Sequence, residues 1–250
     1  MGLPYWMFVD VHTHLTDKAF ENDVGEVIQR SGCLFLINNG YTAEDNRRTI
    51  ALATRYTQVK VALGMHPSET ATVTDTEIAK EKAFIAHQDV FAIGEIGLDF
   101  TYGEHEKQMK WFRAFVTLAM EKNVPMIVHS RKAEKEVIDT LEYLKAKKVV
   151  LHCFTGKLSL ALRAEKLGYF FSIPPIILHS THFQELVQRV SMTKLLTETD
   201  APYLPPNRGE RNEPRNVQLS VQKIAEIKGI DATEAQRMIF LNFQRLFTEK

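Results

Sequence analysis

The sequence is poor in cysteine, carries no excess of charge of either sign and contains no long apolar run. Among its 250 residues, only Cys33 and Cys153 are cysteines, and two cannot build a disulfide framework. Both lie in apolar stretches, which indicates buried free thiols. Lysine plus arginine and aspartate plus glutamate each number 31, so the formal net charge is zero. This balance argues against extensive, unspecific binding along duplex DNA, which needs many cations to neutralise the phosphates.

The N-terminal segment lacks the features of a secretory signal and of a membrane span. It has no basic start, and Asp10 interrupts its apolar run. We therefore expect a soluble, cytoplasmic protein with no membrane partner. No repeat, low-complexity tract or linker divides the chain, so we predict a single barrel domain over residues 1–250.

Short apolar runs alternate with longer amphipathic stretches along the chain. The runs expected to form strands are MFVDVH, CLFLIN, VKVALG, VFAIGE, PMIVHS, VVLHCF, YFFSI and KLLTETD. The stretches expected to form helices are 22–32, 43–56, 74–88, 104–122, 133–145, 158–168, 181–190, 217–228 and 232–247. Near-continuous apolar runs are typical of buried parallel strands, and their alternation with helices predicts an α/β fold. About eight such units predict a TIM-type (β/α)8 barrel, with a doubly wound open sheet as the alternative.

Residues that can bind a metal stand at the carboxyl ends of these apolar runs. They are His12, His14, His66, Glu95, His129, His152 and Asp200. In a barrel, the carboxyl ends of all strands open onto one face, where these side chains would converge. Each residue alone has an ordinary interpretation, such as a hydrogen-bonded core histidine or, for Asp200, a turn cap. Burying such groups without partners costs on the order of several kcal/mol each, so the joint pattern favours a metal centre.

The type and number of these groups predict two divalent metal ions. Imidazole and carboxylate ligands without thiolates suit zinc, manganese, iron or cobalt, and magnesium is less well matched. The two histidines of the first run, with Asp200 and one oxygen of Glu95, would hold one ion. His129 and His152, with the other oxygen of Glu95, would hold the second. A carboxylate that bridges two ions about 3.5–4 Å apart serves the hydrolysis of phosphoesters and amides.

The ordered motifs resemble those of the TatD family of metal-dependent hydrolases over nearly the whole chain. The matching stretches are DVHTHL, ALGMHP, AIGEIGLDF, PMIVHSR, LHCFTG, TETDAPYLPP, RGERNEP and NFQRLF. The resemblance implies a TIM barrel, a two-metal site and metal-dependent nuclease activity on DNA, in some members as 3′–5′ exonuclease action. It implies as metal ligands His12, His14, Glu95, His129, His152 and Asp200. It also implies that His66 lies beside them and contacts the substrate.

The chain departs from this family pattern at one place. Members commonly carry a glycine after the FS of the seventh strand, where this sequence has Pro174 and Pro175. That loop borders the expected site, so the departure bears on substrate preference more than on metal binding.

The expected reaction is hydrolysis by a metal-activated water, with Asp200 and the bridging Glu95 as the catalytic carboxylates. Asp200 would orient the water and accept its proton, while the ions neutralise charge on the phosphate. His66 would donate a hydrogen bond to a phosphate oxygen. Arg131, two residues after His129, would hold another phosphate oxygen; the alternative is a surface ion pair with a glutamate of the following helix.

The irregular segment 201–216 follows the last strand and concentrates arginines. Barrels often bind phosphate with the loops after their last two strands, so we predict substrate contacts for Arg208 and Arg211. A solvated loop balanced by its own glutamates is the alternative. A few local arginines on a neutral chain suit a nucleic-acid substrate that is single-stranded or held by one strand end. Tyr203 and Phe154 are candidates to stack on a terminal base, although core packing is expected for Phe154.

Two other functions are alternatives to the nuclease, one of them a different reaction and the other non-catalytic. An activated water attacks a carbonyl carbon as readily as phosphorus, so an amide or ester hydrolase, such as an aminoacyl-tRNA deacylase, could use the same site. Related amidohydrolases often carry a bridging carboxylated lysine at the fourth strand, where this chain has Glu95 and no lysine. A non-catalytic barrel is the other alternative, but it should have lost ligands, and the set of six is complete.

Other polar residues are assigned supporting or surface positions. Asp10 and Glu198 share strand parity with the predicted ligands, so we expect them to face inward and orient those ligands. The histidines outside the set are expected on the surface or at a polar helix start; they are His87, His105, His179 and His182.

Overall fold

Eight parallel strands follow one another in chain order around a barrel in the computed structural model, which describes residues 7–248. The strands are β1 (Phe8–Thr13), β2 (Cys33–Gly40), β3 (Val59–Leu63), β4 (Ala92–Asp99), β5 (Met126–Arg131), β6 (Val149–His152), β7 (Phe170–Ile173) and β8 (Leu195–Thr197). Each strand from β1 to β7 pairs in parallel with the next along the chain. The predicted barrel is confirmed over the open sheet, because the strand order never reverses. The first six residues, which begin the segment searched for a signal, and residues 249–250 lie outside this description.

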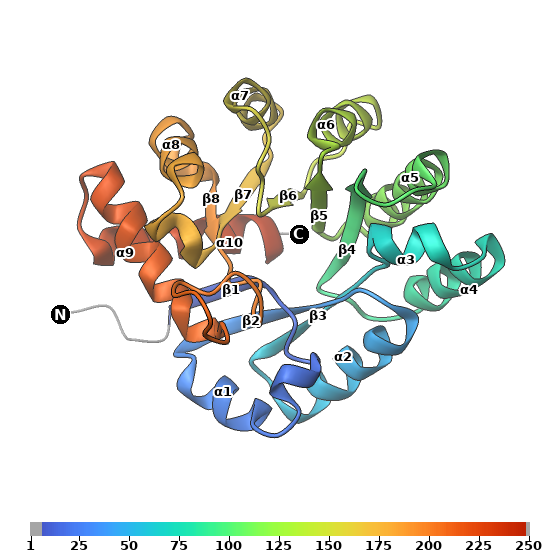
Figure 1. Ribbon diagram of the computed structural model, residues 1–250, viewed down its shortest axis with the longest axis horizontal. Helices are drawn as coiled ribbons and strands as arrows, with labels where there is room; N and C mark the ends of the chain where they lie inside the picture. The colour runs from blue at the N-terminus through green and yellow to red at the C-terminus, as the bar shows by residue number, and fades with distance from the viewer. Residues whose placement is uncertain (1–6, 249–250) are drawn as a thin grey trace.

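Helices follow the strands and cover the outside of the barrel (Figure 1). They are α1 (Val24–Arg30), α2 (Ala43–Arg55), α3 (Pro67–Thr72), α4 (Asp75–Ala86), α5 (His105–Lys122), α6 (Glu134–Tyr143), α7 (Leu158–Lys166), α8 (Thr181–Arg189), α9 (Val217–Lys228) and α10 (Ala232–Phe247). Short 3-10 helices are η1 (Lys18–Phe20), η2 (Pro175–Leu178), η3 (Met192–Lys194) and η4 (Pro214–Asn216). The sequence prediction missed α3, because six residues are too few to show an amphipathic repeat. No helix within residues 7–248 is both long and apolar enough to span a membrane.

The last strand meets the first at a seam held largely by side chains. The Thr197 hydroxyl donates to the carbonyl oxygen of Val9 at 2.7 Å. Asp10 is fully buried there, and its carboxylate accepts hydrogen bonds from the amides of His12 and Thr199 and from the Thr199 hydroxyl. Two backbone hydrogen bonds of 2.8 Å continue the seam, from Asp200 N–H to the carbonyl oxygen of His12 and from His14 N–H to the carbonyl oxygen of Ala201. Asp10 therefore positions the backbone of a predicted ligand rather than its imidazole ring.

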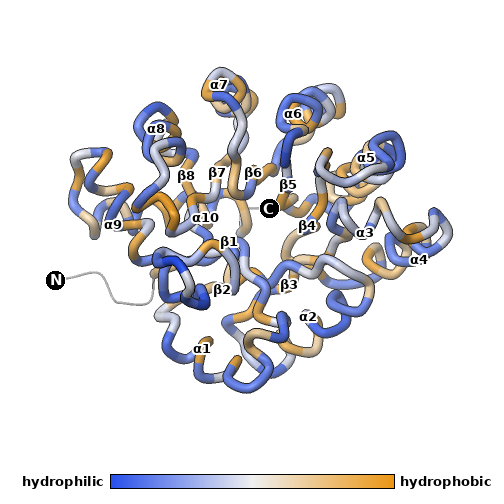
Figure 2. Tube along the Cα trace, viewed as in Figure 1, coloured by the Kyte–Doolittle hydropathy of each residue, from blue (hydrophilic) through white to orange (hydrophobic). Residues whose placement is uncertain are grey.

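An aromatic cluster closes the amino-terminal end of the barrel. Phe243 of α10 is fully buried and stacks on Phe35 of β2, with ring centroids 4.9 Å apart, and on Phe247 at the same separation. Phe91, directly before β4, stacks on Phe247 at 5.5 Å. Helices such as α6 and α8 direct hydrophilic residues away from the strands (Figure 2). Since one end is filled by apolar side chains, the opposite end, where the strands finish, is left for polar side chains.

Candidate metal centre

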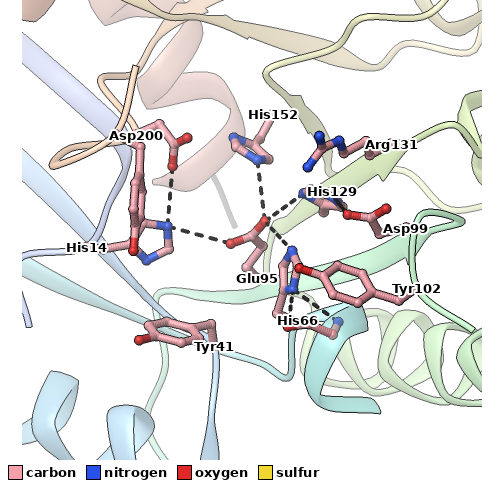
Figure 3. A pocket seen from close by; sticks show the side chains of 12 residues that line it. His14, Tyr41, His66, Glu95, Asp99, Tyr102, His129, Arg131, His152 and Asp200 are labelled. Atoms are coloured by element: carbon pink, nitrogen blue, oxygen red, sulfur yellow. Dashed lines mark hydrogen bonds and ion pairs between the residues drawn. The ribbon is translucent and has the colours of Figure 1, made fainter. Parts of the chain in front are cut away.

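The polar residues predicted at strand ends come together around one of their number, Glu95, and all of them except His12 are drawn in Figure 3. They reach this point from β1, β4, β5, β6 and the segments after β1, β3 and β8. All of them except His12 line a cavity of about 350 Å³, and His12 lies fully buried beside it. The convergence that strand topology predicts is therefore present in the folded chain.

One oxygen of Glu95 faces two histidines, which Asp200 also contacts. Glu95 Oε2 lies 3.5 Å from His12 Nε2 and 3.6 Å from His14 Nε2. Asp200 Oδ1 lies 3.4 and 3.3 Å from the same two nitrogens, which are 3.1 Å from each other. Four ligand atoms held tetrahedrally around one ion, at bond lengths of about 2.0–2.2 Å, are about 3.3–3.6 Å apart. The donors of His12, His14 and Asp200, which all lie within 4.8 Å of one another, are thus spaced closely enough to hold a single divalent ion.

The other oxygen of Glu95 faces a second set of ring nitrogens. Glu95 Oε1 lies 2.9 Å from His129 Nδ1 and 3.4 Å from His152 Nε2. His66 Nε2 is 3.6 Å away. Glu95, His129 and His152 form a group able to hold an ion, as do His12, His14 and Asp200. One buried carboxylate therefore presents each of its oxygens to a different set of nitrogen donors.

Hydrogen bonds on the far side of each ring orient three of the histidines. The His14 Nδ1 donates to the carbonyl oxygen of Asn39 at 2.9 Å, which turns Nε2 toward the centre. His152 Nδ1 lies 3.2 Å from Glu198 Oε2, and His129 Nε2 lies 3.3 Å from Asp99 Oδ2. Such carboxylate–histidine pairs fix the ring and its tautomer for metal binding.

Of the two carboxylates that orient these rings, the sequence predicted Glu198 but not Asp99. Glu198, expected to face inward, is fully buried and also accepts hydrogen bonds from Ser172 Oγ and from Cys153 N–H, the latter at 2.8 Å. Asp99 was not singled out from the sequence. It ends the same strand that carries Glu95, four residues later and on the same face, and that parity was the available signal.

His66 differs from these histidines because its Nδ1, the ring nitrogen that faces away from Glu95, accepts a hydrogen bond rather than donating one. It caps the amino end of α3, where its Nδ1 accepts a hydrogen bond from Ser68 N–H at 3.1 Å. Burial lowers the pKa of His66 to about 4, so the ring is neutral near pH 7. Its single proton then lies on Nε2, which faces Glu95 Oε1. This geometry makes His66 a hydrogen-bond donor toward the cavity.

The cluster strongly favours positive charge at its centre. Although burial alone would raise the pKa of Glu95, the surrounding histidines, His66 and His12 first among them, hold it well below 4.5. The pKa of Asp200 is likewise lowered against its burial, by hydrogen bonds from His12 and His14. Burial opposes protonation of His14, but its hydrogen bond to Asp200 raises its pKa to about 9. Ionised carboxylates facing ring nitrogens are the donor set that a divalent cation requires.

The predicted substrate contacts are only partly gathered at this centre. Arg131 lines the cavity beside His129 and His152 (Figure 3), and within residues 7–248 it forms no ion pair with the glutamates of α6. Tyr203 also lines the cavity, and its hydroxyl donates to Asp17 at 3.0 Å. Phe154 is fully buried, as core packing requires.

The two arginines of the 201–216 segment that were predicted to contact the substrate lie away from the cavity. The Arg211 guanidinium binds Asp23 and Glu213, at 2.6 and 2.9 Å, and covers the ring of Phe20. Arg208 is exposed near the tip of the segment and is not among the residues that line the cavity. Tyr41 and Tyr102 do line it and were missed, because a single tyrosine in a loop carries no positional signal.

The remaining sequence assignments lie outside the centre. His87, His105 and His179 are exposed, and His182 contacts the carbonyl oxygen of Phe154 at 3.0 Å. The Pro174–Pro175 pair is buried at the start of η2, and neither proline lines the cavity.

The chain is similar to known proteins over nearly its whole length. Residues 9–248 match the sequence model of a family described as TatD related DNase. The chain is 33% identical to an uncharacterized metal-dependent hydrolase of Methanocaldococcus jannaschii, MJ1582, over 97% of this chain and 98% of the relative. It is 34% identical to the human deoxyribonuclease TATDN3, over 96% of this chain and 94% of the relative. Among solved structures, the TatD homolog YJJV of Escherichia coli matches with a TM-score of 0.91 and 27% identity, over 98% of this chain and 100% of that one.

Proposed function

This chain belongs to the TatD family of metal-dependent hydrolases, and we propose that it hydrolyses phosphodiester bonds of DNA with two divalent ions. The observation that carries the proposal is the position of Glu95. Its Oε2 faces His12 and His14, and its Oε1 faces His129 and His152. A carboxylate placed in this way is suited to bridge two ions.

The proposed ligands of the two ions share only Glu95. His12, His14 and Asp200 would complete the first site; His129 and His152 would complete the second. Nitrogen and carboxylate donors suit zinc or manganese, and magnesium is also compatible. Bound there, the ions would lower the pKa of water and neutralise charge on the phosphate.

Residues of this chain would position the substrate and move the proton. Asp200, with 15% of its side chain exposed, is ionised and reaches the cavity, so it can orient the attacking water and accept its proton. The proton on His66 Nε2 would be shared with a non-bridging phosphate oxygen. The Arg131 guanidinium would pair with another, since no carboxylate among the described residues occupies it.

The substrate that we propose is a single strand or strand end, shortened in the 3′–5′ direction. A cavity of about 350 Å³ lies at the lower end of the range of roughly 300–1,000 Å³ for small-molecule sites. Such a cavity suits a terminal nucleotide better than a duplex. Tyr102 and Tyr203, which are 42% and 51% exposed at its rim, offer faces for a base.

A metal-rescue nuclease assay tests this proposal. Chelated protein would receive 5′-labelled single-stranded DNA with magnesium, manganese or zinc. Asp200→Ala is the test variant, and Asp89→Ala, an exposed aspartate before β4, is the matched control. We expect a metal-dependent ladder shortened from the 3′ end, lost in Asp200→Ala and kept in Asp89→Ala. A protein that binds two ions but cleaves no DNA with any metal would refute the nuclease and favour amide or ester hydrolysis.

A further inference from the structure

The loops around the cavity differ in the charge that they leave unpaired. After β1, β2, β3 and β4 the chain presents carboxylates, namely Asp17, Glu44, Glu69 and Glu104. After β8, Arg211 is neutralised by Asp23 and Glu213, whereas Arg208 and Arg215 are exposed and form no ion pair within residues 7–248, but neither lines the cavity. Free carboxylates repel a polyanion, and an arginine already paired gains little from a phosphate. Lys18 after β1 and Arg48 after β2 are likewise exposed cations without an ion pair in the described part of the chain, and neither of them lines the cavity.

The end of β5 and the loops after β5 and β6 differ in that they place exposed cations next to a cation that lines the cavity. Arg131 ends β5, Lys132 follows it, and Lys157 lies after β6. All three are exposed and take part in no ion pair within residues 7–248. Arg131 already lines the cavity. Lys132 is the next residue, and Lys157 directly precedes α7. Unpaired cations on an exposed rim are the groups that phosphates bind with release of counterions.

The two lysines lie on loops that contact each other. Strands β5 and β6 are neighbours in the barrel. The hydroxyl of Thr155, after β6, donates to Glu134 Oε1, after β5, at 3.1 Å. Gly156 lies so close to Glu134 that a Cβ on it would come within 2.9 Å of the Glu134 Cβ. Glu134, the carboxylate between the loops, forms no ion pair with either lysine. Lys132 and Lys157 thus lie on two loops that meet next to Arg131, and with it they outnumber the one carboxylate, Glu134, that lies between these loops.

We propose that Lys132 and Lys157 bind phosphates of a DNA strand next to the nucleotide in the metal centre, so that the strand leaves the cavity over the loops after β5 and β6. The proposal rests on the proposed nuclease function, and it adds the path and the residues that hold the strand. It also explains how a chain with zero net charge can bind a polyanion, since the cations that matter are concentrated in one place.

A direct binding measurement tests this path of the DNA strand without depending on catalysis. The anisotropy of a fluorescently labelled oligothymidylate would be followed over a range of salt concentrations. The test variant is Lys132→Gln with Lys157→Gln. The matched control is Lys145→Gln with Lys147→Gln, two exposed lysines in the segment between α6 and β6, at the opposite end of the barrel. Both pairs lose the same charge, and one member of each, Lys132 and Lys145, has a left-handed backbone, with φ of 53° and 56°.

The expected loss of DNA affinity, and the change in its salt dependence, follow from counterion release. For single strands, each phosphate contact contributes about 0.7 to the slope of log affinity against log salt. Losing two contacts should lower this slope by about 1.4 and weaken binding roughly 25-fold at about 0.1 M salt. The control pair should keep the slope of the natural protein.

Three results would overturn the path: an unchanged slope in the Lys132 and Lys157 variant, an equal loss in the control pair, or a loss that appears only with Arg208→Gln in the loop after β8. Hydrolysis of bis(p-nitrophenyl) phosphate by the natural protein reports separately on the nuclease. If that hydrolysis is absent with every metal while the lysine variant still loses oligonucleotide affinity, the proposed function fails and the binding path stands.

Discussion

Loading of the metal centre should release protons, and the pH dependence of metal affinity measures them. In the metal-free protein, burial opposes a proton on His14, but its hydrogen bond to Asp200 raises the pKa of His14 to about 9. Near pH 7 this ring therefore holds a second proton, whereas a metal ligand must present a bare nitrogen. The two pH units between 7 and 9 correspond to about 3 kcal/mol, or roughly 100-fold in apparent affinity. The pKa values of His129 and His152 are also raised against their burial. The change in metal affinity that His14 alone produces is therefore a lower bound for the whole centre.

Isothermal titration calorimetry with zinc or manganese, in two buffers of different ionisation enthalpy, would count the released protons. We expect at least one proton per protein near pH 7, and an affinity that rises at least roughly 100-fold between about pH 7 and 9. His14→Asn removes the titrating ring and should flatten part of this dependence. A metal affinity that stays constant over this range would refute the reasoning.

The same pKa shift predicts the opposite trend for the stability of the metal-free protein. The pKa of His14 is raised from 6.5 in the unfolded chain to about 9 in the folded one. Its contribution is therefore complete below pH 6.5 and is lost as the pH rises through 9, a change of about 3 kcal/mol. Urea denaturation of chelated protein at the two ends of this range measures the loss. Metal-loaded protein should keep its stability over this range, because the gain in binding as the proton leaves offsets the loss in the metal-free protein.

Four substitutions test single residues, three of them in the site and one in the aromatic cluster at the other end of the barrel. Glu95→Ala should abolish metal retention and hydrolysis together, and full activity in a metal-content and nuclease assay would exclude a bridging carboxylate. Asp99→Asn should lower the affinity for one ion by about 10–100-fold; equal losses for both ions in a calorimetric titration would show that it does not act through His129. Arg131→Ala should raise KM for DNA far more than it lowers kcat, and unchanged kinetics would return Arg131 to a surface role. Phe243→Ala should lower the free energy of unfolding by about 3–5 kcal/mol, and a loss below about 1 kcal/mol in urea denaturation would mean that the aromatic cluster is not tightly packed.

The strand pattern and the positions of the metal-capable residues were readable from the sequence. Buried parallel strands need apolar side chains on both faces, so a histidine or carboxylate at the end of such a run is conspicuous. Glu95 and His152 stood out for this reason. Helix α3 and the tyrosines of the cavity rim did not, because a six-residue helix and a single loop residue have no period to detect.

Pairings between distant segments required the folded chain. The sequence could not distinguish a free Arg211 from one bound to Asp23, 188 residues away, because such an ion pair depends on how two loops meet. The same holds for Asp99 beside His129 and for the contact between the loops after β5 and β6. Local sequence specifies which groups are costly to bury and therefore where a site must lie. The distances between those groups, and the charges that neighbouring loops cancel or leave free, depend on packing between residues far apart in the chain, and they set what the site can bind.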